Sequence, residues 1–373
     1  MKIAVLTSSR ADYGIYLPLL KKLEADDFFE LEIIAFGTHL STFHGYTLQQ
    51  IRQDGFNVTH KLETLILGDS EIAIANAIGN TITRFSGLWE GLREKINLVL
   101  ALGDRYEMFA AVAASTPFNI PIAHFHGGET TLGAIDNKFR HAISQMSTLH
   151  FTSTEAYANR VSAMIGDTAN VFNVGALSLD NLMDFSLLSL EAFQQQFNID
   201  LRFPTILTTF HPETVDIEKN VVYAQKLVEV FEQLATRYQV VITMPNADTL
   251  GGAIREVFKK IIGTNDKVIG VENFGTLGYF SCIKHCRFLL GNTSSGIIEA
   301  ASFGKFVINI GNRQKGRARS RNIFDVPIER EAILNAVAMI EDHNYKFDGK
   351  NAYFQKNSSQ KVVNLLKAFY VNQ

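Results

Sequence analysis

Cysteine is scarce in this sequence, which has only two among its 373 residues, Cys282 and Cys286. They stand four apart in CIKHC, a spacing that places both on one face of a helix near His285. A structural zinc site needs further ligands, and no second ligand pair accompanies this one. We therefore expect two reduced thiols that serve packing, since free cysteine is among the most buried residue types.

An excess of charge of one sign is also lacking, because 35 basic residues nearly balance 38 acidic ones. Proteins that bind the phosphate backbone of nucleic acids need a basic field, so nucleic acid is not an expected partner. No apolar run approaches the roughly 20 residues that span a bilayer, and MKIAVLTSS reads as a strand without the apolar stretch of a signal peptide. We expect a cytoplasmic protein without a membrane partner.

Two glycine-rich nucleotide motifs are missing. The first turn, TSSRADYG, carries Arg10 where a dinucleotide-binding fold has its G-x-G-x-x-G fingerprint. The chain also lacks the G-x-x-x-x-G-K-[ST] loop of ATPases. Neither NAD nor FAD is therefore indicated, no cofactor and no metal are expected, and an ATPase is disfavoured.

The sequence does contain an alternation of short β-rich runs with longer segments of helical period. This alternation is typical of parallel sheets joined by helical crossovers. It is interrupted by the leucine-rich, helix-like SLLSLEAFQQQF and by NIDLRFP, after which a second series begins. The length also exceeds the roughly 100–200 residues of one domain. The sequence therefore predicts an α/β protein of two doubly wound, Rossmann-like domains, residues 1–180 and 181–373, with a linker at about 180–204.

The ends of the expected strands are the place to look for a ligand site. Strands are expected at IAVLTSS, LEIIAFG, INLVLALGD, IPIAHFHGG, LHFTST and VFNVG, and in the second half at TILTTFH, QVVITMP, KVIGVEN, CRFLLGN and FVINIG. Ligands of such sheets bind outside the carboxyl ends of the strands. Polar residues gather at these ends, as in FGTHL, GDRYE, HFHGGE, FHPET, MPNAD and GNTSSG.

In the second half, GNTSSGIIEA follows a strand and opens a helix. Ser294 and Ser295 would expose backbone N–H groups at the positive end of that helix, which suits a phosphate as well as an ordinary N-cap. Glu299, four residues after Ser295, is placed to accept hydrogen bonds from a ribose diol. Arg313 follows the next strand, in GNRQKGR, and is a candidate for the diphosphate or for sugar contact. His211 ends a strand beside a proline and is expected at the same site.

In the first half, Asp104 follows a strand and a glycine in LALGDRYE. HFHGGETTLGAIDNKFRH adds His126 and Glu129 near one strand end, and Asp136 and Arg140 four apart at the start of a helix. That spacing puts a carboxylate and a guanidinium on one helical face, either as a surface ion pair or as a general base held near an arginine. The glycine pair before Glu129 lets the backbone approach a ligand. We favour the catalytic interpretation.

Taken in order, SSRADYG, GTHL, LGDRYE, HFHGGE, DNKFRHAISQMS, FHPET, NADT, GNTSSGIIEA and GNRQKGR resemble the UDP-N-acetylglucosamine 2-epimerases, most of all the hydrolysing branch of bacterial sialic acid synthesis. The similarity covers residues 1 to about 330. It implies the glycosyltransferase-B-like fold, with UDP held mainly by the second Rossmann-like domain, the sugar facing the first, and the active site in the cleft between them. It also implies a homo-oligomer, a dimer or a tetramer.

The resemblance implies an anti elimination of UDP across C1–C2 of UDP-N-acetylglucosamine, giving 2-acetamidoglucal, and then a hydration that releases N-acetylmannosamine. Removing the C2 proton needs a base, and departure of the diphosphate needs cationic stabilisation, while neither step needs a redox cofactor. By residue-to-residue match, Asp104, Asp136 and Arg140 take the places of the catalytic acid, base and arginine. The other catalytic candidates are His126, Glu129 and His211, and the substrate-binding candidates are Arg10, His39, Asp180, Asn246, Ser294, Ser295, Glu299 and Arg313.

Two positions depart from the pattern of the family. Many relatives carry Glu where this chain has His126, and a second acid where it has Asn137. A neutral histidine can relay a proton near pH 7, so His126 is a candidate substitute that Glu129 would assist. We rank Asp104 and Asp136 ahead of His126 as the group that removes the C2 proton.

Other functions share these motifs. A hydrolysing epimerase of a 2,4-diacetamido-2,4,6-trideoxy sugar nucleotide, UDP-N,N'-diacetylbacillosamine of the legionaminic acid pathway, would look almost the same, since C4 and C6 are remote from the chemistry. A non-hydrolysing epimerase, a glycosyltransferase of the same fold and a non-catalytic nucleotide-sugar sensor are further alternatives. Asp104 and Asp136 disfavour the glycosyltransferase, which need not abstract a carbon-bound proton. A sensor would bind UDP yet tolerate loss of Asp104, so one substitution separates it from an enzyme.

Overall fold

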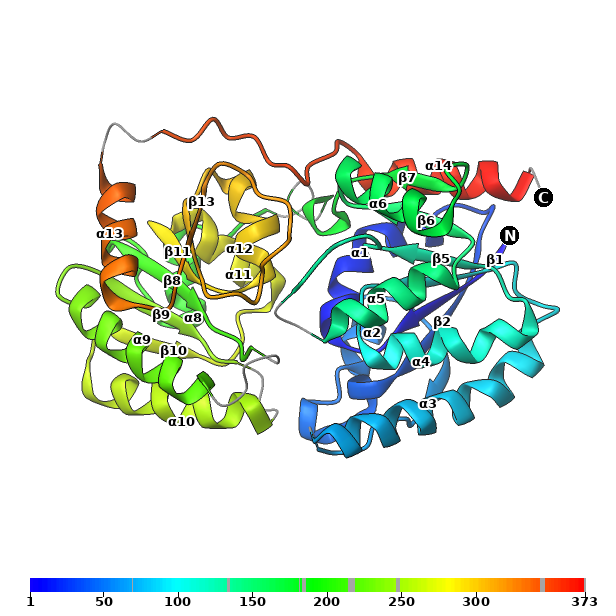
Figure 1. The fold of residues 1–373 in the computed structure, drawn as a ribbon, viewed down its shortest axis with the longest axis horizontal. Coiled ribbons are helices and arrows are strands. Elements are labelled where there is room, and N and C mark those ends of the chain that lie inside the picture. The colour runs from blue at the N-terminus through cyan, green and yellow to red at the C-terminus, as the bar shows by residue number, and fades with distance from the viewer. Residues whose placement is uncertain are drawn as a thin grey trace. The chain divides into compact units, whose positions relative to one another are not determined.

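The computed structural model describes residues 1–68, 70–132, 135–180, 182, 186–213, 219–245, 249–342 and 346–371. The chain divides into two compact units, each built around a parallel sheet (Figure 1). The first unit comprises Met1–Glu129, Asp136–Met183 and Tyr353–Gln373, and the second comprises Thr130–Ile135 and Asp184–Ala352. The predicted α/β architecture of two Rossmann-like domains is confirmed.

The first unit contains a seven-stranded sheet in the order β3-β2-β1-β4-β5-β6-β7, and every neighbouring pair is parallel. Its strands are β1 Lys2–Thr7, β2 Glu30–Phe36, β3 Val58–Leu62, β4 Leu98–Leu102, β5 Ile122–Phe125, β6 Leu149–Thr152 and β7 Val171–Asn173. Its helices are α1 Arg10–Glu24, α2 Leu48–Gln53, α3 Glu71–Leu92, α4 Tyr106–Ser115, α5 Asp136–Gln145, α6 Glu155–Ile165 and α14 Ser358–Val371. All six strands expected in this half are present.

The second unit repeats the pattern with a six-stranded parallel sheet in the order β10-β9-β8-β11-β12-β13. Its strands are β8 Thr205–Thr209, β9 Gln239–Thr243, β10 Val268–Val271, β11 Phe288–Gly291, β12 Val307–Ile310 and β13 Ile323–Val326. Its helices are α8 Leu190–Phe197, α9 Asn220–Leu234, α10 Thr249–Thr264, α11 Gly275–His285, α12 Ser294–Ile298 and α13 Arg330–Glu341. The five expected strands are again present.

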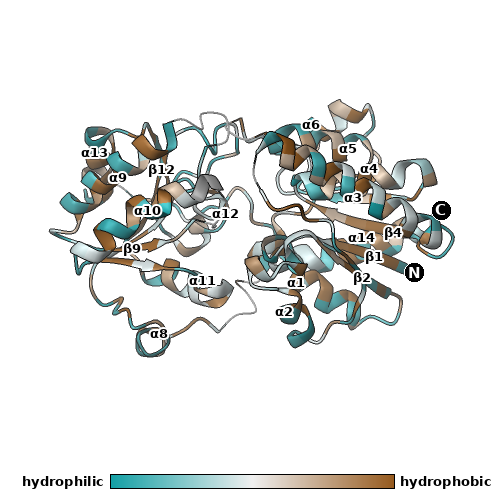
Figure 2. Ribbon diagram, turned by 90° about the horizontal axis from the view of Figure 1, so that it is seen from below, coloured by the Kyte–Doolittle hydropathy of each residue, from teal (hydrophilic) through white to brown (hydrophobic). Residues whose placement is uncertain are grey.

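The central strands are apolar on both faces, because helices cover both sides of each sheet. In β1, Ile3 and Val5 belong to one hydrophobic core while Ala4 and Leu6 belong to the core on the opposite face. Successive side chains of a strand point to opposite faces, so a strand covered twice is a continuous apolar run. Figure 2 shows β1 and β4 in the hydrophobic colour along their length. This continuity is why these strands are readable from sequence.

Two strands, β3 and β13, were not expected from the sequence, and both lie at the edge of a sheet. In β3 exposed polar side chains such as Thr59 and Lys61 alternate with more buried ones, and β13 includes the exposed Asp325. An edge strand is paired on one side only and is often polar. Neither segment therefore contains the apolar run that reveals a central strand.

The observed units differ from the predicted ranges 1–180 and 181–373, because the C-terminal residues belong to the first unit. Helix α14, red in Figure 1, packs with α1 in the first unit and buries Val362, Val363 and Leu366 in its core. The residues Thr130–Ile135 belong to the second unit, where the Leu132 N–H donates to the Lys315 carbonyl at 3.0 Å. Both differences depend on contacts between segments that are distant in sequence, which local patterns do not record.

Cys282 lies in α11 and Cys286 caps its C-terminus, and both are buried free thiols, which confirms the packing interpretation. Burial raises the pKa of the Cys286 thiol to about 12, so this sulfur stays protonated near neutral pH. Among the described helices, none is long and apolar enough to cross a membrane. Over the same residues, no three histidine, cysteine or acidic side chains gather in a way that could hold a metal ion.

Candidate active site

At the carboxyl edge of the first sheet, Asp104 and Arg140 form an ion pair. Gly103, with a φ of 84°, turns the chain as it leaves β4, and Asp104 follows. The carboxylate of Asp104 accepts a hydrogen bond from Nη2 of Arg140, which lies on α5. The side chain of Arg140 is 2% exposed and that of Asp104 26%, so the carboxylate is the part that solvent or a ligand can reach.

Arg140 also links this ion pair to the turn after β5, because its Nη1 donates to the Glu129 carbonyl at 2.9 Å. Helix α5 begins at Asp136, as the sequence predicts, and Asp136 is half-buried. Arg140, the arginine expected to hold Asp136, forms an ion pair with Asp104, on a different element. A spacing of four along one helix could not reveal a partner 36 residues away in the sequence.

His126 forms a second polar pair in the same turn. Its Nδ1 lies 2.9 Å from Oε1 of Glu129, which also accepts a hydrogen bond from the Ser153 hydroxyl at 2.7 Å. A carboxylate can only accept, so Nδ1 carries the proton and Nε2 is the basic nitrogen. Nε2 of His126 is buried and has no hydrogen-bond partner within the part of the chain that the structure describes. One basic nitrogen is therefore oriented and unoccupied.

The backbone of His126 is strained, with a φ of 63° that a residue with a side chain rarely adopts. Its N–H donates to the Phe151 carbonyl of β6 at 2.9 Å, which holds the turn in place. Such conformations cost of the order of 1–3 kcal/mol and concentrate at functional sites. The strain thus supports a functional interpretation of His126.

The glycine pair after His126 has a different use from the expected approach of a ligand. A Cβ on Gly127 would lie 2.8 Å from the Ser144 hydroxyl and 3.0 Å from Nδ1 of His124. A Cβ on Gly128, whose φ is 75°, would lie 2.5 Å from the Tyr157 carbonyl. These glycines let the turn pack closely against α5 and α6, so the close approach is to the protein itself.

His39, expected to bind substrate, is fully buried at the end of β2. Its Nε2 lies 2.9 Å from the Thr7 hydroxyl and its Nδ1 2.8 Å from the Thr47 hydroxyl. The carboxylate of Asp12, 3.9 Å from Nε2, also accepts hydrogen bonds from the backbone and hydroxyl of Ser8. Both ring nitrogens face hydroxyl groups of the protein, so His39 positions the ends of β1 and β2.

The carboxylate of Asp180, a residue also expected to bind substrate, is engaged within the protein. Its carboxylate accepts the backbone N–H groups of Ser358 at 3.2 Å and Ser359 at 2.5 Å. These are the first residues of α14, so Asp180 pairs with the positive end of that helix. Arg10, by contrast, is exposed at the start of α1, and Asn246 lies outside the described residues.

In the second unit, Asn292 joins the ends of β8 and β11. Its side chain accepts the His211 N–H at 2.7 Å and donates to the His211 carbonyl at 2.8 Å. The Asn292 carbonyl accepts hydrogen bonds from Nη1 of Arg313 at 3.1 Å and from Nε2 of Gln314 at 2.8 Å. Burial, together with the nearby Arg313 charge, lowers the pKa of His211 to about 3. His211 is therefore a neutral imidazole near pH 7.

Glu213 fixes the loop that carries Arg313. Its buried carboxylate accepts the backbone N–H groups of Asn312 at 2.6 Å and Arg313 at 3.2 Å. A Cβ on Gly311 would collide with this carboxylate, which explains the glycine at that position. The result is an arginine held at the carboxyl edge of the sheet beside His211 and Asn292.

The one-turn helix α12 carries Ser294 and Ser295, and its N-cap is Thr293, whose hydroxyl accepts the Ser295 N–H at 3.3 Å. Both serines are half-buried, and Glu299, which is 7% exposed, ends the helix. Because Thr293 supplies the cap, capping does not account for the two serines.

Sequence reasoning missed the residues that hold others in place, chiefly Asp12, Ser153, Glu213 and Asn292. Glu213 and Asn292 lie inside the motifs FHPET and GNTSSG, so their position was noticed but their partners were not. The side chains of Asn292 and Glu213 each accept a hydrogen bond from a backbone N–H that follows another strand, that of His211 and that of Asn312 respectively. No local signal distinguishes such a residue from one that faces a ligand.

Two Rossmann-like units with polar groups at the carboxyl ends of parallel strands define a two-domain α/β protein of the kind that binds ligands at those ends. The sequence model of the family described as UDP-N-acetylglucosamine 2-epimerase matches residues 21–367. The chain belongs to this family.

Two relatives and one solved structure show the range of similar proteins. The chain is 35% identical to a UDP-N,N'-diacetylbacillosamine 2-epimerase (hydrolyzing) of Legionella pneumophila, over 98% of this chain and 95% of that one. It is 32% identical to polysialic acid biosynthesis protein P7 of Escherichia coli, over 99% and 94%. A UDP-GlcNAc 2-epimerase of Neisseria meningitidis, solved with UDP-GlcNAc bound, matches with a TM-score of 0.84 at 19% identity over 99% of this chain and 100% of that one. Hydrolysing epimerases are thus among the similar proteins.

Proposed function

We propose that this protein is a hydrolysing 2-epimerase that converts UDP-N-acetylglucosamine and water to N-acetylmannosamine and UDP, for sialic acid synthesis. The observation that carries the proposal is the group of Asp104, Arg140, Glu129 and His126 in the first unit. In this group a partly exposed carboxylate is paired with a buried arginine. The group also contains a histidine whose basic nitrogen has no hydrogen-bond partner among the described residues. Two groups able to transfer protons are what an elimination followed by a hydration requires.

In the proposed elimination, the carboxylate of Asp104 removes the proton on C2 of the sugar. The electrons of the C2–H bond form the C1–C2 double bond, and the C1–O bond breaks as UDP leaves with its electron pair. Arg140 keeps the Asp104 carboxylate in one position. The products of this step are 2-acetamidoglucal and UDP.

In the proposed hydration, the oxygen of a water molecule bonds to C1 and a proton is delivered to C2 on the face opposite to the one that lost it. Nε2 of His126 exchanges the protons of this step, while Glu129 stabilises the charged imidazolium. The sum of both steps is UDP-N-acetylglucosamine plus water giving N-acetylmannosamine plus UDP. Asp136 is the alternative acid for either proton.

We propose that UDP binds at the carboxyl edge of the second sheet. Arg313 would stabilise the charge that develops on the diphosphate, with the backbone N–H groups near Ser294 and Ser295. Glu299 would accept hydrogen bonds from the ribose diol, and the neutral His211 would contribute a hydrogen bond rather than a charge. Arg10 is the candidate phosphate contact of the first unit.

The experiment that tests the proposal is a proton NMR time course with UDP-N-acetylglucosamine in D₂O, without added metal or nucleotide cofactor. We expect free N-acetylmannosamine with deuterium at C2, together with UDP. Release of UDP-N-acetylmannosamine would make the protein a non-hydrolysing epimerase, and a bound but unreacted substrate would contradict an epimerase role for this substrate.

The second candidate substrate is UDP-N,N'-diacetylbacillosamine, which the name of the 35% identical Legionella relative favours. The chemistry at C1 and C2 would be the same. Parallel measurements of kcat/KM with both sugar nucleotides decide between them, since the true substrate should be preferred by tenfold or more. Light scattering on the purified protein tests the homo-oligomer that the family resemblance supports, and cell fractionation tests a cytoplasmic location.

A further inference from the structure

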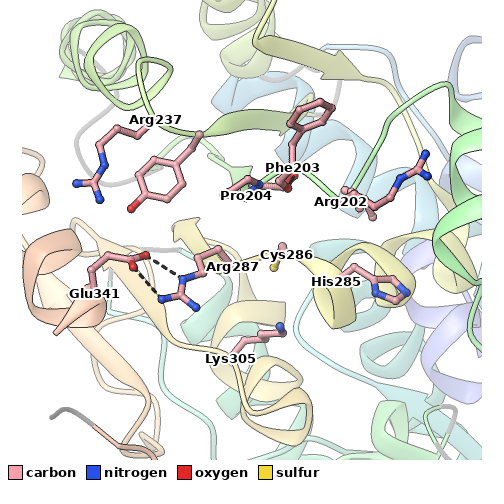
Figure 3. A pocket seen from close by; sticks show the side chains of 12 residues that line it. Arg202, Phe203, Pro204, Arg237, His285, Cys286, Arg287, Lys305 and Glu341 are labelled. Atoms are coloured by element: carbon pink, nitrogen blue, oxygen red, sulfur yellow. Dashed lines mark hydrogen bonds and ion pairs between the residues drawn. The ribbon is translucent and has the colours of Figure 1, made fainter. Parts of the chain in front are cut away.

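A pocket of about 510 Å³ lies in the second unit, at the amino edge of its sheet (Figure 3). Its lining includes Thr205 at the start of β8, Tyr238 just before β9, Arg287 just before β11 and Lys305 just before β12. The candidate residues for UDP follow the opposite, carboxyl ends of strands in the same sheet. Because these strands have four or five residues, the pocket is separated from that edge by about 13–17 Å.

The lining of the pocket is strongly cationic. It contains Arg202, Arg237, Arg287 and Lys305 together with His285, and its one carboxylate is Glu341. Figure 3 shows Arg287 in a bidentate ion pair with Glu341. Nε of Arg287 donates to Oε1 of Glu341 at 3.0 Å, and Nη2 donates to Oε2 at 2.8 Å. Arg202 pairs with Asp200 at 2.8 Å, on the exposed side of its loop. The single acid of the lining is thus already engaged.

In the described part of the chain no carboxylate is among the groups that act on the Lys305 ammonium, and this side chain is only partly exposed. Burial lowers the pKa of its ammonium group, and the nearby Arg287 lowers it further. An ammonium that loses water and faces a second cation is unfavourable unless an anion joins them. Within the described residues, the Lys305 ammonium therefore lacks an anionic partner.

Helix dipoles explain only part of this arrangement. Arg287 follows α11, Arg237 follows α9, and Lys305 follows a 3₁₀ turn at Ala300–Phe303, so each cation is favoured near a negative helix end. That effect would be served equally well by side chains that extend into solvent. It does not explain why cations from four separate loops line one cavity whose only carboxylate is that of Glu341.

We propose that this pocket binds the phosphate group of a small phosphorylated metabolite, with Lys305 as its contact. Arginine and lysine are the side chains that bind phosphate in proteins, and a dianion would offset the repulsion among the cations. The volume exceeds that of a phosphate, and Tyr238 and the 62% exposed Phe203 line the rest. The ligand therefore carries a ring beside its phosphate, and it binds at a site separate from the substrate.

Isothermal titration calorimetry with inorganic pyrophosphate tests the phosphate site. Pyrophosphate should bind the wild-type chain at two places, this pocket and the candidate diphosphate site at Arg313. Lys305→Met should weaken binding at the pocket by at least tenfold and leave binding at the Arg313 site unchanged. Arg313→Ala should weaken binding at the Arg313 site and leave binding at the pocket unchanged. Lys260→Met, which removes an exposed lysine of α10 away from the pocket, is the matched control and should bind as wild type does.

Binding that is insensitive to Lys305→Met, or a single binding event that Arg313→Ala abolishes, would overturn the proposal. Thermal unfolding gives a second readout, because removal of a desolvated ammonium should leave the Tm of Lys305→Met unchanged or higher without ligand. Pyrophosphate should then raise the Tm of the wild type by more than that of Lys305→Met. Epimerase turnover of Lys305→Met should stay at the wild-type rate, so a failure here is distinguishable from a failure of the proposed function.

Discussion

At the scale of single residues, the carboxylate of Glu129 decides which nitrogen of His126 is basic. It accepts from Nδ1 and is itself held by the Ser153 hydroxyl, so the imidazole cannot easily turn or change tautomer. The strained backbone at His126 adds a second constraint. A histidine constrained in this way serves a directional proton transfer better than a freely rotating one would.

Glu129→Gln is expected to lower kcat by about 10²–10⁴, the usual contribution of a positioned acid or base. The amide cannot stabilise the imidazolium and can favour the wrong tautomer. The measurement is the pH dependence of kcat with the NMR assay, in which the variant should also shift its profile. Ser153→Ala keeps the carboxylate and loses one hydrogen bond, so it should lose less than about tenfold. A wild-type rate for Glu129→Gln would remove this pair from the mechanism.

Asp104→Asn is expected to abolish turnover while UDP still binds, because the amide cannot accept the C2 proton. Retained UDP affinity, measured by calorimetry, shows that the variant is folded. Asp104→Glu is the companion variant, since it keeps the charge that pairs with the buried Arg140 but moves it by one methylene. An active Asp104→Asn variant would exclude Asp104 as the base and leave Asp136.

At the scale of elements, the strand ends of the second sheet are packed so tightly that one glycine is essential. Gly291 ends β11 with a φ of 154°, and a Cβ there would overlap the backbone carbonyl of Thr209 in β8. The same two strands lead directly to Asn292 and to His211, which are hydrogen-bonded to each other. The packing of β8 on β11 therefore sets the geometry of the candidate nucleotide site.

Gly291→Ala is expected to destabilise the protein by about 2 kcal/mol or more, because the overlap is with backbone and cannot relax by rotation of a side chain. Urea unfolding measures this loss. Gly263→Ala in α10 is the control, since no atom lies within 4 Å of the added Cβ and alanine favours a helix. That variant should be stabilised by about 0.5–1 kcal/mol. Equal stability of the two variants would contradict the tight contact.

At the scale of the whole molecule, the C-terminal helix α14 completes the core of a unit that begins at Met1. Val362, Val363 and Leu366 are buried with side chains of β1, β4 and α1, and Asp180 holds the first turn. The apolar face of α14 would otherwise be exposed to water. The two ends of the chain therefore fold as one unit.

Leu366→Ala is expected to lower the free energy of unfolding by about 2–5 kcal/mol, the usual cost of a large-to-small change in a core. Gln360→Ala, on the exposed side of the same helix, should change it by less than about 0.5 kcal/mol. Chemical denaturation of both variants is the measurement. A mild effect of Leu366→Ala would mean that α14 is attached loosely.

The stability of the whole molecule is also expected to depend on pH through buried histidines, among them His124, His150 and His211. Burial lowers the pKa of His124 to about 3 and that of His150 to about 4, while an unfolded histidine titrates near 6.5. Below pH 6.5 the unfolded state binds more protons than the folded state. The free energy of unfolding therefore decreases as the pH is lowered, by about 1.4 kcal/mol per pH unit for each histidine. Denaturation between pH 7.5 and 4.5 measures the slope, which His124→Asn should reduce. Identical slopes would contradict a neutral buried His124.

The candidate residues whose side chains bond within the protein and those that keep an accessible group differ in their partners, not in their local context. His39 and Asp180 follow strand-like segments, just as Asp104 and His126 do. In the fold, His39 faces two threonines and Asp180 faces the start of α14, whereas Asp104 keeps a partly exposed carboxylate. A polar residue after a strand has the same local pattern whether its partner is a ligand or another part of the chain.

Local sequence patterns sufficed to predict the two doubly wound sheets, the central strands and the carboxyl ends at which polar residues collect. These features follow from local hydrophobic periodicity, because a strand covered on both faces must be apolar along its whole length. The folded chain alone shows that Arg140 pairs with Asp104, that Glu129 orients His126, that α14 returns to the first unit, and that cations from four loops line one pocket. Each of these depends on pairing between segments far apart along the chain, which the burial of apolar surface brings together and no local pattern encodes.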